Sequence, residues 1–279
     1  MRTHLVTGAN SGIGFETVRA LAGRGERVIM AVRDRQRGEA ARAKVLTEHP
    51  QARIDLELVD LLDLDSVRAL ASRIDSLDVL INNAGLGTAP LLLTKERVYS
   101  QFGANHLGHF LLTTLLLPKL ENGTDPRVVT VSSGFGKKGK IDLDNLDAGR
   151  GYSQGRAYMQ SKLANALFGA ELDRRLRARN SKVKSVLVHP GVAATEMQKK
   201  PTGLFGVVAR LVHLLASPPQ RGARPTIDAA MLDSVSGGEV FGPGKGDGPA
   251  KREETWPSMR DVEGATALWK RSEELTGMT

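Results

Sequence analysis

Short apolar runs of strand length alternate with longer, helix-compatible stretches along most of the 279 residues. Six runs are expected to form strands, and they span residues 4–7, 28–32, 54–59, 78–81, 128–132 and 183–189. Nearly continuous Val, Ile and Leu is typical of strands buried on both faces, and helices between strands favour parallel crossovers. The pattern predicts an α/β fold with an open, doubly wound parallel sheet, and it argues against a sandwich or a helix bundle.

The second half of the chain is less regular but belongs to the same unit. Expected helices include 36–48, 65–74, 158–179 and 222–234, with a long helical candidate inside 94–120. A last edge strand is expected at 238–241, followed by a Gly/Pro-rich loop at 242–249. A tail helix at about 261–275 would end at Gly277 and bury Val262, Ala265, Leu268 and Trp269. No linker divides the chain, so we expect one domain over residues 1–279, with a C-terminal extension from about 243 to 279.

Composition removes several classes of protein. The chain has no cysteine, which excludes a disulfide scaffold and a thiolate site. This lack of cysteine fits a reducing compartment, and we expect no bound metal. The net charge of +8 would suit anionic partners, but basic residues are spread over the chain and aromatic residues are only 4%, so no nucleic-acid partner is expected. No apolar run reaches 18 residues and no leader precedes the first strand. We therefore expect no membrane span and a cytoplasmic location.

A glycine-rich turn follows the first expected strand and opens the first helix. Gly8 permits the tight turn, Gly12 lets the backbone approach a pyrophosphate, and Gly14 lets the helix pack close to the strand. The unpaired N–H groups of the helix start would bind phosphate. The candidate cofactor residues of this turn are Gly8, Asn10, Ser11, Gly12, Ile13 and Gly14. A plain Gly-rich turn is the alternative, but the flanking strand and helix favour a dinucleotide.

The end of the second strand decides which dinucleotide is bound. A carboxylate there would bind the ribose 2′-OH of NAD, whereas arginine accommodates the 2′-phosphate of NADP. Arg33 follows the strand directly, so Arg33 and Arg37 are expected to bind the phosphate, and NADP(H) is favoured over NAD. Asp34 is the competing residue. Asp60, with its neighbour Leu61, is expected at the adenine edge, unless Asp60 only caps the following helix.

Tyr158 and Lys162 are spaced i, i+4 on an expected helix, so their side chains project from one face. A phenol has an unperturbed pKa of about 10, and a nearby ammonium would lower it enough for acid–base work near neutrality. The alternative is a surface pair without function. Tyr152 has no lysine four residues later.

Three further groups of candidate site residues come after the fourth and fifth expected strands or in the helical candidate between them. Ser132 and Ser133 end the fifth strand, at the carboxyl edge where such sheets place ligands, and a hydroxyl there can donate to a carbonyl oxygen. Residues 82–85 are small and polar, so their backbone can lie against a cofactor ring. Asn105 lies inside the next helical candidate, where its alternative role is to bond the backbone and bend the helix.

Taken jointly, these residues resemble the short-chain dehydrogenase/reductase family over about residues 3–195. The resemblance rests on motifs in family order: Thr7-Gly8-x-x-x-Gly12-x-Gly14, Asn82-Asn83-Ala84-Gly85, Asn105, Ser133, Tyr158-x-x-x-Lys162 and Pro190-Gly191. It implies a Rossmann-type fold and hydride transfer between a nicotinamide cofactor and an alcohol/carbonyl pair.

The resemblance also implies a role for each matching residue. Tyr158 would exchange a proton with the substrate oxygen, and Lys162 would bind the nicotinamide ribose and lower the pKa of Tyr158. Ser133, the better match of the two serines, would orient the carbonyl, and Asn105 would hold a water in a proton relay. Thr195 would bond the nicotinamide carboxamide. The remaining implied cofactor residues are Asn83, Ala84, Gly85, Pro190, Gly191 and Val192.

Within the family, the chain is most similar to the branch of the retinol dehydrogenases and WW-domain oxidoreductases. The motifs that carry this are residues 31–34, 105–110, 161–165 and 188–191, together with the tail 269–277. The branch implies NADP preference. A lid at about 196–220, apolar between 203 and 216, would lie over the substrate by family position and suits a hydrophobic or bulky compound. Its alternative is core or a subunit contact. Few aromatic residues are present to stack a polyene, so a retinoid substrate is not carried over.

Two lysine clusters flank the expected site. Lys137, Lys138 and Lys140 follow Ser133, and Lys199 with Lys200 follows Thr195; we hypothesise that they attract anionic groups, although solvated faces often look the same. A catalytically silent dinucleotide sensor remains the alternative to an enzyme. The sequence leaves the substrate, the reaction direction and the oligomeric state open.

Overall fold

The computed structural model describes residues 1–191 and 218–278. In these ranges eight strands form one sheet in the order β3-β2-β1-β4-β5-β6-β7-β8, and all neighbours are parallel except β7 and β8. The strands are β1 (Thr3–Thr7), β2 (Arg27–Val32), β3 (Arg53–Leu58), β4 (Val79–Asn82), β5 (Arg127–Val131), β6 (Lys184–Val188), β7 (Val240–Gly242) and β8 (Lys251–Glu253). This order reverses between β1 and β4, and the predicted doubly wound, Rossmann-type α/β fold is confirmed.

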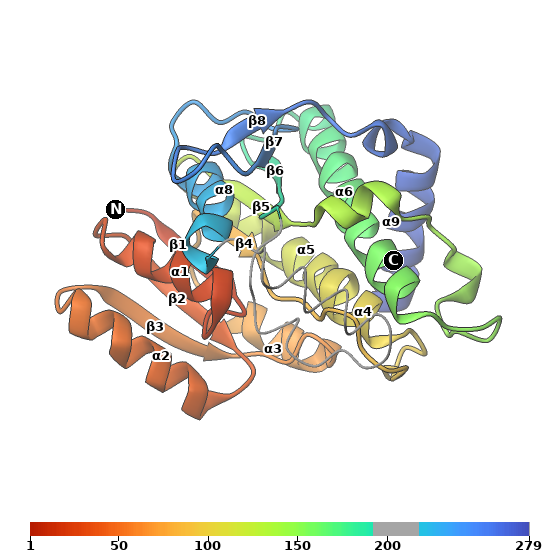
Figure 1. Cartoon of the computed structure of the whole chain (residues 1–279), viewed down its shortest axis with the longest axis horizontal. Helices are drawn as coiled ribbons and strands as arrows, with labels where there is room; N and C mark the ends of the chain where they lie inside the picture. Colours follow the sequence, from red (N-terminus) through yellow and green to blue (C-terminus); the bar gives the residue numbers. More distant parts are fainter. Residues whose placement is uncertain (192–217, 279) are drawn as a thin grey trace.

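Helices cover both faces of the sheet, giving three layers (Figure 1). On one face lie α1 (Gly12–Ala22), α2 (Arg35–Glu48) and α8 (Pro219–Met231). On the other lie α3 (Leu64–Arg73), α4 (Ser100–Phe102), the π-helical turn η1 (Gly103–Leu107), α5 (Gly108–Leu120) and α6 (Gln154–Ala178), with α9 (Val262–Thr276) packed against α6. Short 3₁₀ turns are η2 (Gly134–Lys138), η3 (Leu143–Asn145) and η5 (Pro257–Arg260).

The continuous apolar strands follow from this layering. Leu5 packs into the core under α3, α5 and α6, whereas its neighbour Val6 packs into the core under α1 and α8. Leu80 and Ile81 of β4 divide in the same way between the two cores. Because alternate residues of a strand point to opposite faces, a sheet covered on both sides needs apolar residues at every position.

The C-terminal extension differs from the sequence-based expectation in two places. β7 is not the last strand, because β8 pairs antiparallel outside it. β8 consists of Lys251, Arg252 and Glu253, an exposed edge with no apolar signal to predict it. In α9, Ala265, Leu268 and Trp269 are buried as predicted, but Val262 is 54% exposed and its predicted burial is wrong. Val262 is the first residue of α9.

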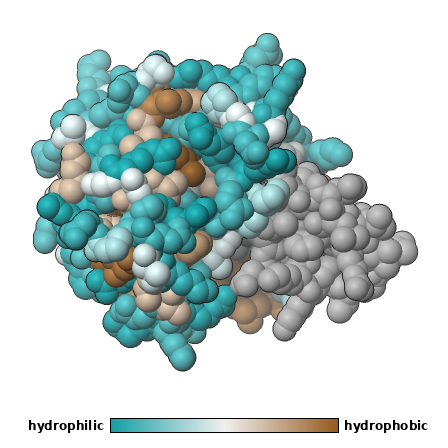
Figure 2. Space-filling view, turned by 60° about the vertical axis from the view of Figure 1, so that its left-hand side comes forward, coloured by the Kyte–Doolittle hydropathy of each residue, from teal (hydrophilic) through white to brown (hydrophobic). Residues whose placement is uncertain are grey.

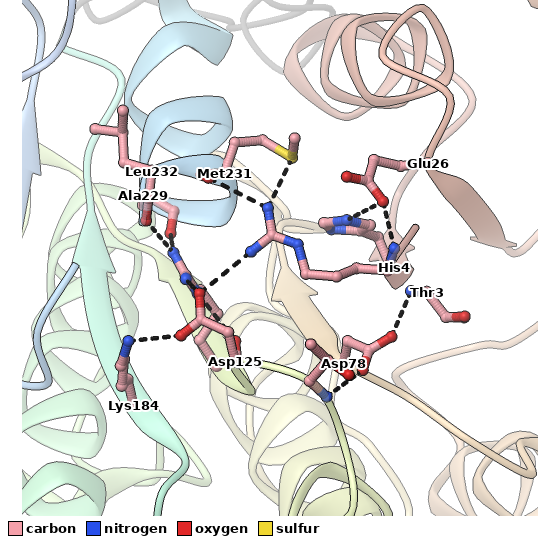
Figure 3. Close-up of polar contacts among 12 residues, drawn as sticks. Thr3, His4, Glu26, Asp78, Asp125, Lys184, Ala229, Met231 and Leu232 are labelled. Atoms are coloured by element: carbon pink, nitrogen blue, oxygen red, sulfur yellow. Dashed lines mark hydrogen bonds and ion pairs between the residues drawn. The ribbon is translucent and has the colours of Figure 1, made fainter. Parts of the chain in front are cut away.

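A polar network lies at the amino-terminal ends of the strands, opposite their carboxyl ends (Figure 3). Arg127, at the start of β5, is fully buried, and its guanidinium donates to the carbonyls of Ala229 (2.9 Å) and Leu232 (2.9 Å) at the end of α8. The same guanidinium pairs with Asp125, which also pairs with Lys184 at 2.6 Å. The buried charge therefore holds α8 against the sheet and is itself neutralised.

The face in Figure 2 is mostly hydrophilic, with hydrophobic residues in small separated areas. Within the described residues, no helix is both long and apolar enough to cross a membrane. The predicted lid at about 196–220 lies outside the described residues apart from its last three positions, and Pro219 already begins α8.

Candidate active site

The glycine-rich turn is tightly packed and needs glycine at two of its positions. Gly8 has φ +65°, and a Cβ on it would lie 2.9 Å from the Cα of Ala84; a Cβ on Gly14 would lie 2.3 Å from the carbonyl of Gly8. α1 begins at Gly12, and in its first turn the N-cap Ser11 makes no side-chain capping bond and no acidic residue is present. The open N–H groups and close backbone approach fit a dinucleotide phosphate.

A cavity of about 350 Å³ lies between this turn and α2. Its lining residues are Asn10, Ser11, Phe15, Arg37, Ala40, Ala41 and Lys44. Arg37 and Lys44 bring two cations to it, whereas Arg33 is exposed after β2 and is not among the lining residues. Asp34, the competing residue for a ribose, caps α2 by accepting from the backbone N–H of Arg37 at 2.9 Å.

The sequence pattern alone does not predict Lys44 or Phe15 as site residues. The signal for Lys44 is its helical spacing, because residues 37, 40, 41 and 44 share one face of α2.

Asp60 does not cap the next helix: it accepts from the N–H of Leu62 at 3.0 Å, and Asp63 caps α3. A Cβ on Gly108 would lie only 2.5 Å from the carbonyl oxygen of Leu61. Glycine at position 108 therefore lets α5 approach the loop that contains Asp60 and Leu61.

The hydroxyl of Ser133 lies close enough to the phenol of Tyr158 to act on its pKa, and both residues are at the carboxyl edge of the sheet. Ser133 follows β5 and caps η2 by accepting from the N–H of Phe135, and Tyr158 is in the second turn of α6. Ser132 is turned away: its hydroxyl donates to the carbonyl of Lys162 at 2.7 Å. The structure therefore puts Ser133, and not Ser132, beside the phenol.

Lys162 is buried one helical turn beyond Tyr158, and its ammonium donates to the carbonyl of Val131 at 3.2 Å. Burial lowers the pKa of Lys162 to about 8. Burial raises the pKa of Tyr158, and the nearby hydroxyl of Ser133 opposes that rise. Desolvation outweighs the effect of Ser133 on the phenol, and the expected effect of Lys162 on the pKa of Tyr158 stays a prediction.

Asn105 lies in η1, a π-helical turn that interrupts the helix expected within residues 94–120. Its side-chain amide donates to the carbonyl of Leu86 (2.9 Å) and to the hydroxyl of Ser161 (2.9 Å), and its Oδ1 accepts from the N–H of Leu86 (2.6 Å). Its side chain thus joins the loop after β4 to α6. A Cβ on Gly85 would lie 3.2 Å from this Oδ1 and 3.3 Å from the Nζ of Lys162, so both atoms face the same small space.

The turn after β4 is tied to the end of β1. The backbone N–H groups of Asn83 and Ala84 both donate to the hydroxyl of Thr7 at 3.0 Å, and the amide of Asn83 donates to the carbonyl of Thr7 at 2.7 Å. These contacts place residues 83–85 beside the glycine-rich turn, as the cofactor prediction requires.

The segment after β6 carries the remaining predicted residues. Pro190 and Gly191 are described, with Gly191 at φ +67° and its N–H 3.4 Å from Nδ1 of His189. Val192, Thr195, Lys199 and Lys200 lie outside the described residues.

Lys137 differs from the expectation of a cation open to anions, because its ammonium pairs with Glu253 at 3.2 Å and lies 5.0 Å from the ring centre of Trp256. Lys138 and Lys140 are exposed.

A glycine-rich turn and a Ser–Tyr–Lys arrangement on one edge of a doubly wound sheet define an oxidoreductase built on a nucleotide-binding fold. The chain belongs to the short-chain dehydrogenase family, whose model matches residues 2–202. The predicted family membership is confirmed.

Curated relatives extend the match beyond that range. Human retinol dehydrogenase 13 is 38% identical over 99% of this chain and 85% of its own length, and human retinol dehydrogenase 12 is 37% identical over 98% and 86%. Among solved structures, an uncharacterised protein from Mycobacterium paratuberculosis is 43% identical with a TM-score of 0.81, covering 99% of this chain and 94% of that one. Salutaridine reductase from Papaver somniferum shares the fold at 22% identity and a TM-score of 0.66, covering 86% and 99%.

Proposed function

We propose that this protein is an NADP(H)-dependent oxidoreductase that interconverts a carbonyl and an alcohol on a hydrophobic or bulky substrate. The observation that carries the proposal is the placement of Ser133 beside the phenol of Tyr158, at the same sheet edge as the glycine-rich turn, with Lys162 one helical turn away. Curated relatives named retinol dehydrogenases support alcohol/carbonyl chemistry.

In this mechanism the chain binds, orients and moves a proton, while the nicotinamide supplies the hydride. The phenol of Tyr158 donates its proton to the substrate oxygen in reduction and takes it back in oxidation. Ser133 donates to the same oxygen and stabilises the negative charge that develops there. The raised pKa keeps Tyr158 protonated at neutral pH, which suits the proton donor of a carbonyl reduction. Lys162 and residues 83–85 would bind the nicotinamide end, and residues 8–14 the pyrophosphate.

The preference for NADP(H) is supported by the charge of the cavity beside α2. Arg37 and Lys44 bring cations to it, and the nearest carboxylate in sequence, Asp34, is committed to the helix cap. Arginine and lysine both bind phosphate, arginine through a planar set of donors.

An apolar substrate is supported by the surroundings of the phenol. Phe135, in the turn η2 that Ser133 caps, is 45% exposed, and its ring centre lies 6.4 Å from that of Tyr158 at an angle of 63°. An exposed aromatic ring beside the proton donor can contact the apolar part of a substrate. We also propose a cytoplasmic location, which the complete lack of cysteine suits; fractionation of the source cells would test it.

The test of the proposed function is oxidation of NADPH with a panel of bulky ketones and aldehydes, retinal included. Tyr158→Phe should lower kcat by about 10² to 10⁴-fold while NADPH binding, followed by its fluorescence, is retained. Tyr152→Phe is the matched control, because Tyr152 bonds the carbonyl of Ala89 at 2.6 Å and has no lysine one turn later. It should keep its turnover.

Two results would count against this function. Undiminished turnover in Tyr158→Phe would remove the phenol from the mechanism. NADPH binding without turnover of any carbonyl by the wild type would favour a silent sensor.

A further inference from the structure

The π-helical turn that holds Asn105 leaves the backbone carbonyl of Asn105 bonded to a side chain. Its partner is His109, whose Nδ1 lies 3.0 Å from that oxygen. The other ring nitrogen, Nε2, lies 2.8 Å from the hydroxyl of Thr7 at the end of β1. All three residues are buried. The imidazole therefore spans from the first strand of the sheet to the turn that presents Asn105.

The direction of every bond in this chain can be deduced. A carbonyl oxygen only accepts, so Nδ1 of His109 carries a hydrogen and donates to Asn105. Burial lowers the pKa of His109 to about 4, so at neutral pH the ring is uncharged and Nε2 is an acceptor. The hydroxyl of Thr7 already accepts from two backbone N–H groups, those of Asn83 and Ala84. Its own hydrogen goes to Nε2 at 2.8 Å rather than to the carbonyl of Ile81 at 3.4 Å.

The chain of bonds joins the two halves of the candidate site. At one end are the backbone of Asn83 and Ala84 and the end of β1, which border the glycine-rich turn. At the other end is Asn105, whose Oδ1 faces the same space as the ammonium of Lys162. π-Helical turns inside α-helices recur at functional sites, and a turn of this kind needs a partner for any carbonyl it displaces.

We propose that His109 is a positioning residue: a neutral imidazole with its hydrogen on Nδ1 fixes Asn105 relative to the dinucleotide turn. This inference rests on the proposed function, since it concerns the same site. His109 contacts neither substrate nor cofactor in this role. Its effect is on where Asn105 sits beside Lys162, and a displacement of about 1 Å can cost on the order of 10²-fold in rate.

Three substitutions separate the two ends of the imidazole. His109→Asn puts an amide N–H near the place of Nδ1 and keeps the bond to Asn105, whereas His109→Gln puts an amide oxygen near the place of Nε2 and keeps the bond to Thr7. His109→Leu keeps neither. The matched control is Thr113→Val, which removes another buried bond from α5 to the sheet, between the amide of Asn82 and the hydroxyl of Thr113 at 2.8 Å.

We expect His109→Leu to lower kcat by about 10- to 100-fold, with the KM for NADPH changed less than about threefold. His109→Asn should recover most of kcat, and His109→Gln should recover less. Thr113→Val should lower the melting temperature and leave kcat unchanged. A merely structural role predicts the opposite pattern, in which kcat follows the melting temperature across all four variants.

The tautomer can be measured without any turnover, by long-range ¹H–¹⁵N correlation NMR of the histidine rings, with His109 assigned from the signal lost in His109→Gln. We expect a protonated Nδ1, an unprotonated Nε2, and no titration between pH 8 and pH 6. A hydrogen on Nε2, or a ring that titrates near 6.5, would overturn the proposal even if the enzyme is active. If the tautomer is found but no carbonyl is turned over, the proposed function fails and the bonding scheme stands.

Discussion

At the scale of single residues, the two adjacent serines after β5 show how one hydrogen-bond partner separates catalysis from structure. The hydroxyl of Ser132 donates to the carbonyl of Lys162, inside α6, and is 2% exposed. The hydroxyl of Ser133 reaches Tyr158 instead. Successive residues of an extended strand end point to opposite sides, so two identical side chains have different neighbours.

This difference predicts different effects of the same substitution. Ser133→Ala should lower kcat by about 10² to 10³-fold, because it removes a donor to the developing oxyanion, with little change in melting temperature. Ser132→Ala should lower the melting temperature, because it removes a buried hydrogen bond between the end of β5 and α6, and lose far less kcat. Steady-state kinetics and thermal unfolding of both variants provide the check. Equal losses of kcat would mean that the two hydroxyls do not divide these roles.

A second prediction at this scale concerns cofactor choice. Lys44→Ala should raise the KM for NADPH by about 5- to 10-fold and leave the KM for NADH unchanged, because one cation near a 2′-phosphate contributes on the order of 1 kcal/mol. Arg35→Ala is the control: it removes an exposed cation from the same helix that does not line the cavity. Parallel loss with both dinucleotides would place the phosphate elsewhere.

At the scale of elements, residues 105–110 form a segment in which four side chains bind four different partners. Asn105 binds the loop after β4, His106 lies 2.8 Å from the hydroxyl of Ser272 in α9, and His109 contacts Thr7 in β1. Phe110 packs on Trp269, with ring centres 5.0 Å apart at 75°. The tail helix is therefore part of the structure that holds Asn105 in place.

This packing predicts that α9 is needed for stability. Trp269 is 6% exposed and also stacks on Phe168 at 5.8 Å, so Trp269→Ala should lower the free energy of unfolding by about 3–5 kcal/mol. Lys270→Ala changes the exposed residue next to it and should have no measurable effect. Urea unfolding at neutral pH measures both variants. Similar stability of the two variants would show that the tail is dispensable.

Elements with a strong apolar pattern could be predicted from the sequence, and elements without one could not. The strands of the parallel sheet contain buried Val, Ile and Leu on both faces, so their positions agree with the structure to within a residue or two. β8 consists of three charged residues at the edge of the sheet. Hydrogen bonds to β7, and not burial of apolar side chains, hold it in place. The π turn at Asn105 was predicted only as helix, because helical periodicity does not change visibly over one inserted residue.

The same limit applies to the site. Tyr158, Lys162 and the glycines were predicted because short-range spacing along one helix or one turn brings them together. Lys44 was missed because its place depends on how α2 packs beside the glycine-rich turn, and the pairing of Lys137 with Glu253 joins segments 116 residues apart. Contacts of that kind depend on the strand order, which local pattern does not specify.

At the scale of the whole molecule, the two edges of the sheet carry different chemistry. The carboxyl edge holds the candidate site, and the opposite edge holds the network of Arg127, Asp125 and Lys184. Buried histidines occur at both. His4, the second residue of β1, lies near that network, and His106 and His109 lie beside Asn105. Burial lowers the pKa of His4 and His106 to about 3 and that of His109 to about 4.

These histidines predict a protein that loses stability in mild acid. Each ring is neutral when folded, but in the unfolded chain it takes up a proton below about pH 6.5, so the unfolded state binds more protons as the pH falls. The contribution is complete above pH 6.5 and is lost progressively toward pH 3–4. At pH 5 each histidine costs roughly 2 kcal/mol, and the three together cost about 6 kcal/mol, which is comparable to the total stability of many proteins.

His4 offers the cleanest test because it lies beside Glu26 in the network of Figure 3, near the start of β1, whereas the candidate site is at the carboxyl ends of the strands. Glu26, 3.8 Å away, favours its charged form, but burial and the charges of Arg2 and Arg127 prevail and keep the ring neutral. His4→Phe keeps an aromatic ring and removes the titration. In urea unfolding, the loss of stability between pH 7 and pH 5 should then shrink by roughly 2 kcal/mol, whatever the packing change costs at pH 7. An unchanged difference would mean that His4 takes up its proton in the folded protein, and that burial does not decide its charge.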